Sequence, residues 1–172
     1  MIDLLIDTNV LIHVLHPTSG AEAGLTRQLL DWDRAGYIRI RVPAVSACEQ
    51  GRSMDMLAAE LDALGLATDR VLVLDNHTEQ AIVEINHVLG HRKPGDSYDA
   101  LIVLTALTWA QQGNDTVLVT GDRNILRHAE PLQALGVPSI VSLRGAVNRL
   151  KINFPLTIES RFRVLGGKTV TA

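Results

Sequence analysis

The sequence is poor in cysteine, in aromatic residues and in long apolar runs. Its 172 residues include one cysteine, Cys48, and only 3% aromatic residues. A single thiol forms no internal disulfide and supplies no Cys-based zinc site, which excludes a disulfide-stapled secreted scaffold and indicates a reducing compartment. The longest apolar stretch, 100–110, is broken by two threonines and is shorter than the roughly 20 residues that span a bilayer. Residues 1–7 carry two acids where a signal peptide needs basic residues, so we expect a cytoplasmic protein without a membrane partner.

What the chain does contain indicates one folded domain with an uneven charge distribution. Hydrophobic residues make up 47% of the sequence, which argues against intrinsic disorder. The net charge is −3, but residues 144–172 alone carry +5, which leaves −8 for the rest. A basic tail favours a nucleic-acid or other acidic partner, with solvated charge at the terminus as the alternative. We therefore divide the chain into a domain at 1–143 and a basic C-terminal extension at 144–172.

Short apolar runs alternate with segments of helical periodicity along the first 142 residues. The runs that predict strands are 4–6, 38–42, 71–74, 116–119 and 139–142. The segments that predict helices are 10–15, 21–35, 44–64 with a break near Gly51 and Ser53, 78–89, 97–112 and a short one near 131–135. This alternation is typical of an α/β fold with a mostly parallel central sheet. The different pattern of 157–170 predicts an appended C-terminal β-hairpin.

Four acidic residues stand where such a fold places functional sites. Asp7 follows the first strand directly, and Asp122 follows strand 116–119 after two residues. If those strands are neighbours, both carboxylates lie at the same edge of the sheet, outside the carboxyl ends of the strands. Glu49 lies in the first helical turns after strand 38–42, and Asp99 begins the most apolar helix.

Each acid alone has a simpler explanation, because acids commonly cap helix N-termini or occupy the first turn. Capping does not explain four acids that converge on one place, because neighbouring carboxylates repel one another and their negative charge must be neutralised. A hard divalent cation, which binds carboxylate oxygens, neutralises that charge. Three or four carboxylates around Mg²⁺ or Mn²⁺ suit metal-assisted phosphodiester cleavage, in which two bound ions lie about 3.5–4 Å apart.

Four segments of the sequence resemble the PIN-domain nucleases, and within them the VapC ribonuclease toxins of toxin–antitoxin pairs. The segments are 7–12 (DTNVLI), 46–49 (SACE), 99–106 (DALIVLTA) and 119–122 (VTGD). The resemblance covers about residues 1–143. It implies a Rossmann-like three-layer α/β/α sandwich that cleaves RNA with Mg²⁺ or Mn²⁺, a homodimer, and an antitoxin partner. It carries over Asp7, Glu49, Asp99 and Asp122 as the catalytic, metal-binding acids.

The resemblance also implies supporting residues around those acids. Asn9 matches a polar residue two places after the first acid, and Thr120 matches the residue that supports the last one. Asn124 stands where some members carry another acid, which leaves the number of metal ions open, and Asp96 is an additional acid beside Asp99. Cations available to flanking RNA phosphates, or else solvated surface charges, are Arg52, Arg92, Lys93, Arg123 and Arg127.

Other readings of the sequence remain open beside the nuclease. We expect Trp32, Trp109 and Cys48 to be buried core residues, and we do not assign the i, i+4 pair His87 and His91 to zinc. A PIN-like module that binds RNA or protein without cleavage is the main alternative. A second alternative is a phosphatase of the haloacid dehalogenase type. That type of enzyme carries an Asp two places after the first Asp, where this sequence has Asn9, which argues against it.

Overall fold

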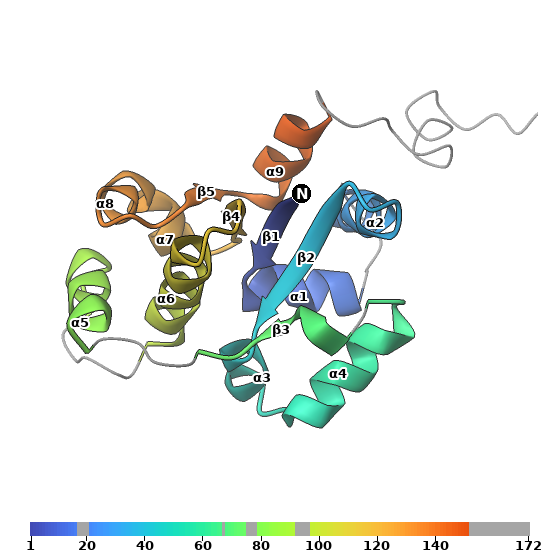
Figure 1. The fold of residues 1–172 in the computed structure, drawn as a ribbon, viewed down its shortest axis with the longest axis horizontal. Helices are drawn as coiled ribbons and strands as arrows, with labels where there is room; N and C mark the ends of the chain where they lie inside the picture. The colour runs from blue at the N-terminus through green and yellow to red at the C-terminus, as the bar shows by residue number, and fades with distance from the viewer. Residues whose placement is uncertain (17–20, 67, 75–78, 92–96, 152–172) are drawn as a thin grey trace, which may run out of the picture.

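A five-stranded, wholly parallel sheet forms the centre of the molecule (Figure 1). The computed structural model describes residues 1–16, 21–66, 68–74, 79–91 and 97–151. The strands are β1 (Ile2–Ile6), β2 (Ile38–Pro43), β3 (Val71–Leu72), β4 (Thr116–Val119) and β5 (Ser139–Val141). They lie in the order β3-β2-β1-β4-β5, with Leu4 opposite both Ile40 and Val117. The parallel sheet confirms the predicted fold class.

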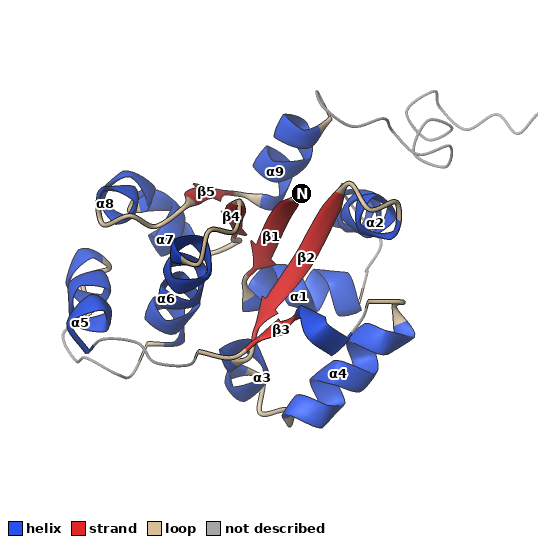
Figure 2. Cartoon of the chain, in the orientation of Figure 1, coloured by secondary structure: helices blue, strands red, loops and turns tan. Residues whose placement is uncertain are grey.

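Helices cover both faces of this sheet (Figures 1 and 2). They are α1 (Thr8–Leu15), α2 (Ala21–Arg34), α3 (Val45–Glu49), α4 (Met54–Ala63), the 3₁₀ turn η1 (Thr68–Arg70), α5 (Glu79–Val88), α6 (Tyr98–Gln111), α7 (Arg123–Arg127), α8 (Ala129–Ala134) and α9 (Leu143–Leu150). Leu4 and Ile6 face a core shared with α1, α2, α4 and α9, whereas Leu5 faces a second core shared with α5, α6 and α8. Alternate residues of one strand thus bury against opposite layers, which confirms the three-layer sandwich. No helix in the described ranges is long and apolar enough to cross a membrane.

Side chains at the helix starts fix where the helices begin. The side chains of Asp7, Ser53, Ser97, Asp122 and Ser142 each accept a hydrogen bond from a backbone N–H in the first turn of the following helix. These caps satisfy donors that have no partner within the helix. The predicted break in 44–64 is confirmed, since α3 ends at Glu49 and the chain turns through Gly51 at a φ of +64°.

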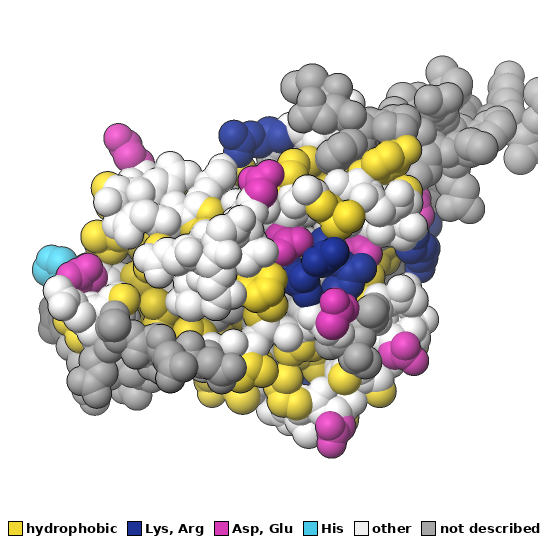
Figure 3. All heavy atoms as spheres, in the orientation of Figure 1, with side chains coloured by type: hydrophobic (Ala, Val, Ile, Leu, Met, Phe, Trp, Pro, Cys, Tyr) yellow, Lys and Arg dark blue, Asp and Glu magenta, His cyan; other side chains and the backbone are white. Residues whose placement is uncertain are grey.

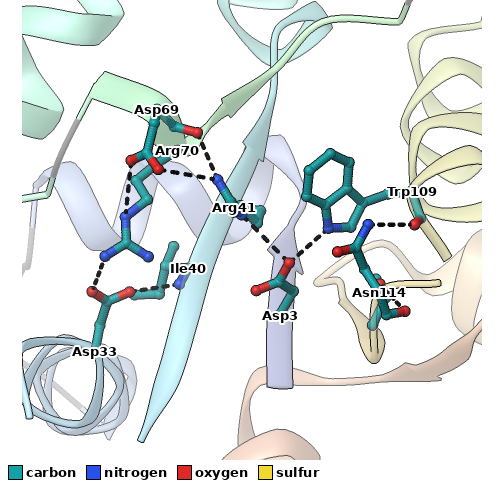
Figure 4. Close-up of polar contacts among 9 residues, drawn as sticks. Asp3, Asp33, Ile40, Arg41, Asp69, Arg70, Trp109 and Asn114 are labelled. Atoms are coloured by element: carbon teal, nitrogen blue, oxygen red, sulfur yellow. Dashed lines mark hydrogen bonds and ion pairs between the residues drawn. The ribbon is translucent and has the colours of Figure 1, made fainter. Parts of the chain in front are cut away.

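A network of charged residues ties β1 and β2 to the elements around them (Figure 4). The carboxylate of buried Asp3 accepts a hydrogen bond from Trp109 Nε1 at 2.7 Å and lies 3.5 Å from Arg41 Nε. The Arg41 guanidinium also lies over the Trp109 ring, 5.0 Å from its centroid, and donates to the Asp69 carbonyl oxygen. On the face seen in Figure 3, basic and acidic side chains lie together over the region of β2 and β3. Trp109, which contacts both Asp3 and Arg41, packs against the second core.

The structure differs from the sequence expectations at Cys48 and at the start of the basic extension. Cys48 is exposed, so its prediction as a buried residue was wrong. Residues 144–150, assigned to the extension, form most of α9, whose Ala146, Val147 and Leu150 are buried in the first core. Arg144 and Arg149 are exposed on this helix, so the basic residues of 144–150 belong to a packed helix and not to a separate extension. The predicted hairpin at 157–170 lies outside the described residues, and the division of the chain at 143 stays a prediction.

Candidate active site

Asp7 and Asp122 meet at the carboxyl edge of the sheet because their strands are neighbours. β1 pairs with β4, and the N–H of Asp7 donates to the Val119 carbonyl at 3.0 Å. Asp7 is 2% exposed. Its Oδ1 accepts the Val10 N–H at 2.8 Å, and its Oδ2 accepts the Gly121 N–H at 3.0 Å and the Thr120 hydroxyl. The carboxylate therefore caps α1 and binds the loop that follows β4.

The Thr120 hydroxyl joins the two acids. Thr120 is fully buried; its Oγ1 donates to Asp7 and accepts the Asp122 N–H at 2.9 Å. Asp122 Oδ1 in turn accepts the N–H groups of Asn124 and Ile125 at 2.6 and 2.9 Å and so caps α7. Capping, the simpler explanation for each acid, holds for both residues, and it fixes both carboxylates beside one loop.

Asp99 and Glu49 reach the same edge from the helices. Asp99 lies in the first turn of α6, which Ser97 caps, and Glu49 is the last residue of α3. Burial is the main cause that raises the pKa of the Asp99 carboxyl, and the charges of Asp122, Glu49 and Asp7 raise it further. The four acids are therefore near enough for their charges to be felt at one carboxylate.

Burial also raises the pKa of the Asp7 carboxyl, although the hydrogen bonds from Thr120, Val10, Gly121 and Asp122 lower it. A carboxyl whose pKa is raised by burial and by like charges gains from a nearby cation. Carboxylate oxygens are also the ligands that Mg²⁺ and Mn²⁺ prefer, so the donor set fits such an ion chemically. Among the described residues, no group of three or more His, Cys, Asp or Glu side chains is arranged to hold a metal ion.

His91 is a neighbour of the site that the sequence did not reveal. Its Nε2 lies 3.9 Å from Asp99 Oδ2, and a protonated His91 lowers the pKa of that carboxyl. His91 follows the end of α5 and reaches Asp99 because α5 packs on α6. The two lie eight positions apart in the sequence, and no local motif links them.

The predicted supporting residues divide into two groups. Asn9 is exposed and lies against the loop after β4, where a Cβ added to Gly121 would come 3.3 Å from the Asn9 Cβ. Asn124, in contrast, donates from Nδ2 to the Leu89 carbonyl at 3.0 Å. Its side-chain amide therefore ties α7 to the end of α5. Asp96 lies outside the described residues.

The predicted phosphate-binding cations are also placed differently from one another. Arg52 forms an ion pair with Glu60, and its Nη2 lies 3.3 Å from His16 Nε2. Arg123 and Arg127 are exposed on α7. Arg92 and Lys93 belong to the part of the chain that the structure does not describe.

The fold and the edge on which these acids meet define an α/β domain with an acidic site at the carboxyl ends of neighbouring parallel strands. The model of one family, described as the PIN domain, matches residues 4–131. The chain belongs to the PIN domain family, whose members are typically nucleases that use divalent metal ions.

A search of solved structures also found similar chains, and one is described as the crystal structure of VapBC2 from Rickettsia felis bound to a DNA fragment from their promoter. That chain shares 16% sequence identity with this one at a TM-score of 0.46, and the alignment covers 83% of this chain and 98% of that one. Among curated proteins, none matches the sequence significantly.

Proposed function

We propose that the protein is a metal-dependent endoribonuclease that hydrolyses RNA phosphodiester bonds. One observation carries the proposal: the Thr120 hydroxyl binds both Asp7 and the Asp122 N–H, and the charges of Asp122, Glu49 and Asp7 all raise the pKa of Asp99. Like charges gathered at one edge of a sheet, in a family of nucleases, suit a site that binds a cation together with a polyanionic substrate.

Asp7, Asp99 and Asp122 would hold Mg²⁺ or Mn²⁺, with Glu49 contributing directly or through water. A bound ion of this kind supplies a water of lowered pKa and neutralises charge on the reacting phosphate. The protein's own part is positioning: Thr120 and the Gly121 N–H fix one oxygen of Asp7. The caps on α1 and α7 fix the direction of both aspartates.

RNA cleavage by the full chain, with Asp99→Asn as the variant, tests this proposal. Asp99 is the best position to change, because Ser97 and not Asp99 caps α6. We expect wild-type protein to cut labelled RNA in Mg²⁺ or Mn²⁺ and not in EDTA. If Asp99→Asn removes several kcal/mol of the stabilisation that the metal ion gives to the transition state, the cleavage rate should fall by about 100-fold or more.

Asp115→Asn is the matched control, because exposed Asp115 lies just before the opposite end of β4. Equal loss in both variants, or cleavage that persists in EDTA, would contradict the proposal. RNA binding without cleavage in either metal would instead favour the non-cleaving module. That alternative draws support from the lack, in the described ranges, of three ligands arranged around one point.

The likeness of the four sequence segments to VapC toxins extends the proposal to a biological role. We infer a toxin that acts as a homodimer and is held inactive by an antitoxin protein. Expression of the wild-type chain without a partner then arrests growth, whereas Asp99→Asn does not. Light scattering of the purified protein measures the dimer, and a monomer at all concentrations would contradict that part.

A further inference from the structure

A cleft of about 740 Å³ opens directly beside the acidic site. It is lined by Asn9, Thr120 and Asp122 and by Arg144, which lies in the first turn of α9. Arg123 and His13 also line it, as does one acid, Glu22. The volume lies in the range of sites that hold ligands of nucleotide size, roughly 300–1,000 Å³.

The two arginines of this cleft stand where helix stability does not favour them. Arg123 is the first residue of α7, and Arg144 is the second residue of α9. Cations in the first turn face the positive end of the helix dipole, which disfavours them. Both are exposed, and within the described residues neither forms an ion pair, unlike Arg52 with Glu60. The cleft beside the acidic site is thus lined by two arginines that have no ion-pair partner in the part of the chain that the structure describes.

The walls between these charges are apolar. Leu25 of α2 and Leu126 of α7 line the cleft and are partly exposed. Cations beside partly exposed apolar side chains suit a ligand with a phosphate and a flat, weakly polar ring. A nucleotide has that character, and an RNA phosphate binds guanidinium groups through charge-assisted hydrogen bonds.

We propose that this cleft seats the RNA nucleotide next to the one that is cut, with Arg123 and Arg144 binding its phosphates and Leu25 and Leu126 packing on its base. The position relative to the cut rests on the proposed function, because it takes Asp122 as part of the cleaving site. The binding of RNA in the cleft does not rest on cleavage and is tested separately.

The test is the affinity for a fluorescein-labelled single-stranded RNA in EDTA, measured by anisotropy from 50 to 200 mM salt. We expect the double variant Arg123→Gln/Arg144→Gln to bind at least about tenfold more weakly at the lowest salt. Each phosphate contact contributes about 0.7 to the salt slope for a single strand, so the slope should fall by about 1.4. The charge-preserving variant Arg123→Lys/Arg144→Lys should keep the slope.

Arg149→Gln/Lys151→Gln is the matched control. It removes the same charge from the opposite end of α9, where both side chains are exposed. The inference is overturned if the control loses as much affinity as the cleft variant, if the cleft variant keeps its affinity and slope, or if wild-type protein does not bind RNA. An unchanged cleft variant would point instead to a protein segment as the occupant.

The same measurements separate the two proposals. RNA that binds through both arginines and is never cut in Mg²⁺ or Mn²⁺ refutes the proposed nuclease and keeps the binding site. RNA that is cut at the wild-type rate and with the wild-type KM by the cleft variant refutes the binding site and keeps the nuclease.

Discussion

Replacement of Thr120 by valine tests whether one buried hydroxyl holds the acidic site together. Valine has nearly the shape of threonine, so the change removes two hydrogen bonds and creates little cavity. Asp7 loses a donor to its carboxylate, and the Asp122 N–H loses its acceptor at 2.9 Å. The Asp122 N–H is left unpaired, which costs about 1–3 kcal/mol, whereas Asp7 keeps the Gly121 N–H and loses one bond to a charged group, worth about 1.5–3 kcal/mol. The two together predict a loss of about 2.5–6 kcal/mol in the free energy of unfolding at pH 7.

Urea denaturation measures this loss, and Thr105→Val is the control. Thr105 is also buried, but its hydroxyl donates to the Leu101 carbonyl within α6 at 2.7 Å. Its removal leaves no acid without a donor, so we expect a change below about 1 kcal/mol. Equal losses in the two variants would refute the reasoning.

The loss of unfolding free energy in Thr120→Val should depend on pH, which provides a second, independent test. The Thr120 hydrogen bond lowers the pKa of Asp7, which burial raises, so the variant's Asp7 titrates at still higher pH in the folded state. An acid with a raised folded pKa loses stability as the pH rises from its unfolded pKa, roughly 4, through its folded pKa. The deficit of the variant is therefore smallest near pH 4 and grows toward neutral pH. A deficit independent of pH would show that the hydroxyl does not act on the carboxylate.

Three further predictions concern single side chains. Asp99→Asn should raise the melting temperature in EDTA at pH 7 and not near pH 4, because burial and like charges raise the pKa of Asp99; a lower melting temperature at pH 7 would contradict this repulsion. Gly121→Ala should destabilise the fold by up to about 1 kcal/mol in urea, since the new Cβ meets the Asn9 Cβ at 3.3 Å at an exposed position, where less is lost than in a packed core; an unchanged midpoint would show that the loop adapts. Trp109→Phe removes the donor to buried Asp3 and should cost about 1–3 kcal/mol; the loss should vanish in an Asp3→Ala background, which has no acceptor, if that bond is its cause.

The sheet and its two aspartates could be predicted from the sequence because the apolar runs along the chain agree with the positions of the strands in the fold. An apolar run such as 4–6 suits a strand that is buried on both faces, as in the middle of a parallel sheet, and β1 does lie at its centre. Asp7 and Asp122 follow such runs closely in sequence. Their positions at one edge then follow from the pairing of β1 with β4.

The features that escaped prediction depend on how separate elements pack. The spacing of Leu143, Ala146, Val147 and Leu150 is that of a buried helix face, yet the basic residues between them suggested a tail. The structure shows that those basic residues occupy the other side of α9. Two other features depend on how helices are placed in the fold. The placement of α3 exposes Cys48, and the placement of α5 brings His91 next to Asp99. No pattern in the sequence around either residue encodes these features.

The site and the fold share some of the same hydrogen bonds, which decides what each acidic variant can show. Asp7 caps α1 and binds two groups of the loop after β4. An amide in its place turns a donor toward other donors, so Asp7→Asn perturbs the fold and the site together. Asp99 has no such role, because Ser97 caps its helix. A loss of cleavage in Asp99→Asn, accompanied by an unchanged or higher melting temperature, therefore assigns the loss to chemistry. The same loss in Asp7→Asn does not, and the two variants measure different properties of one acidic site.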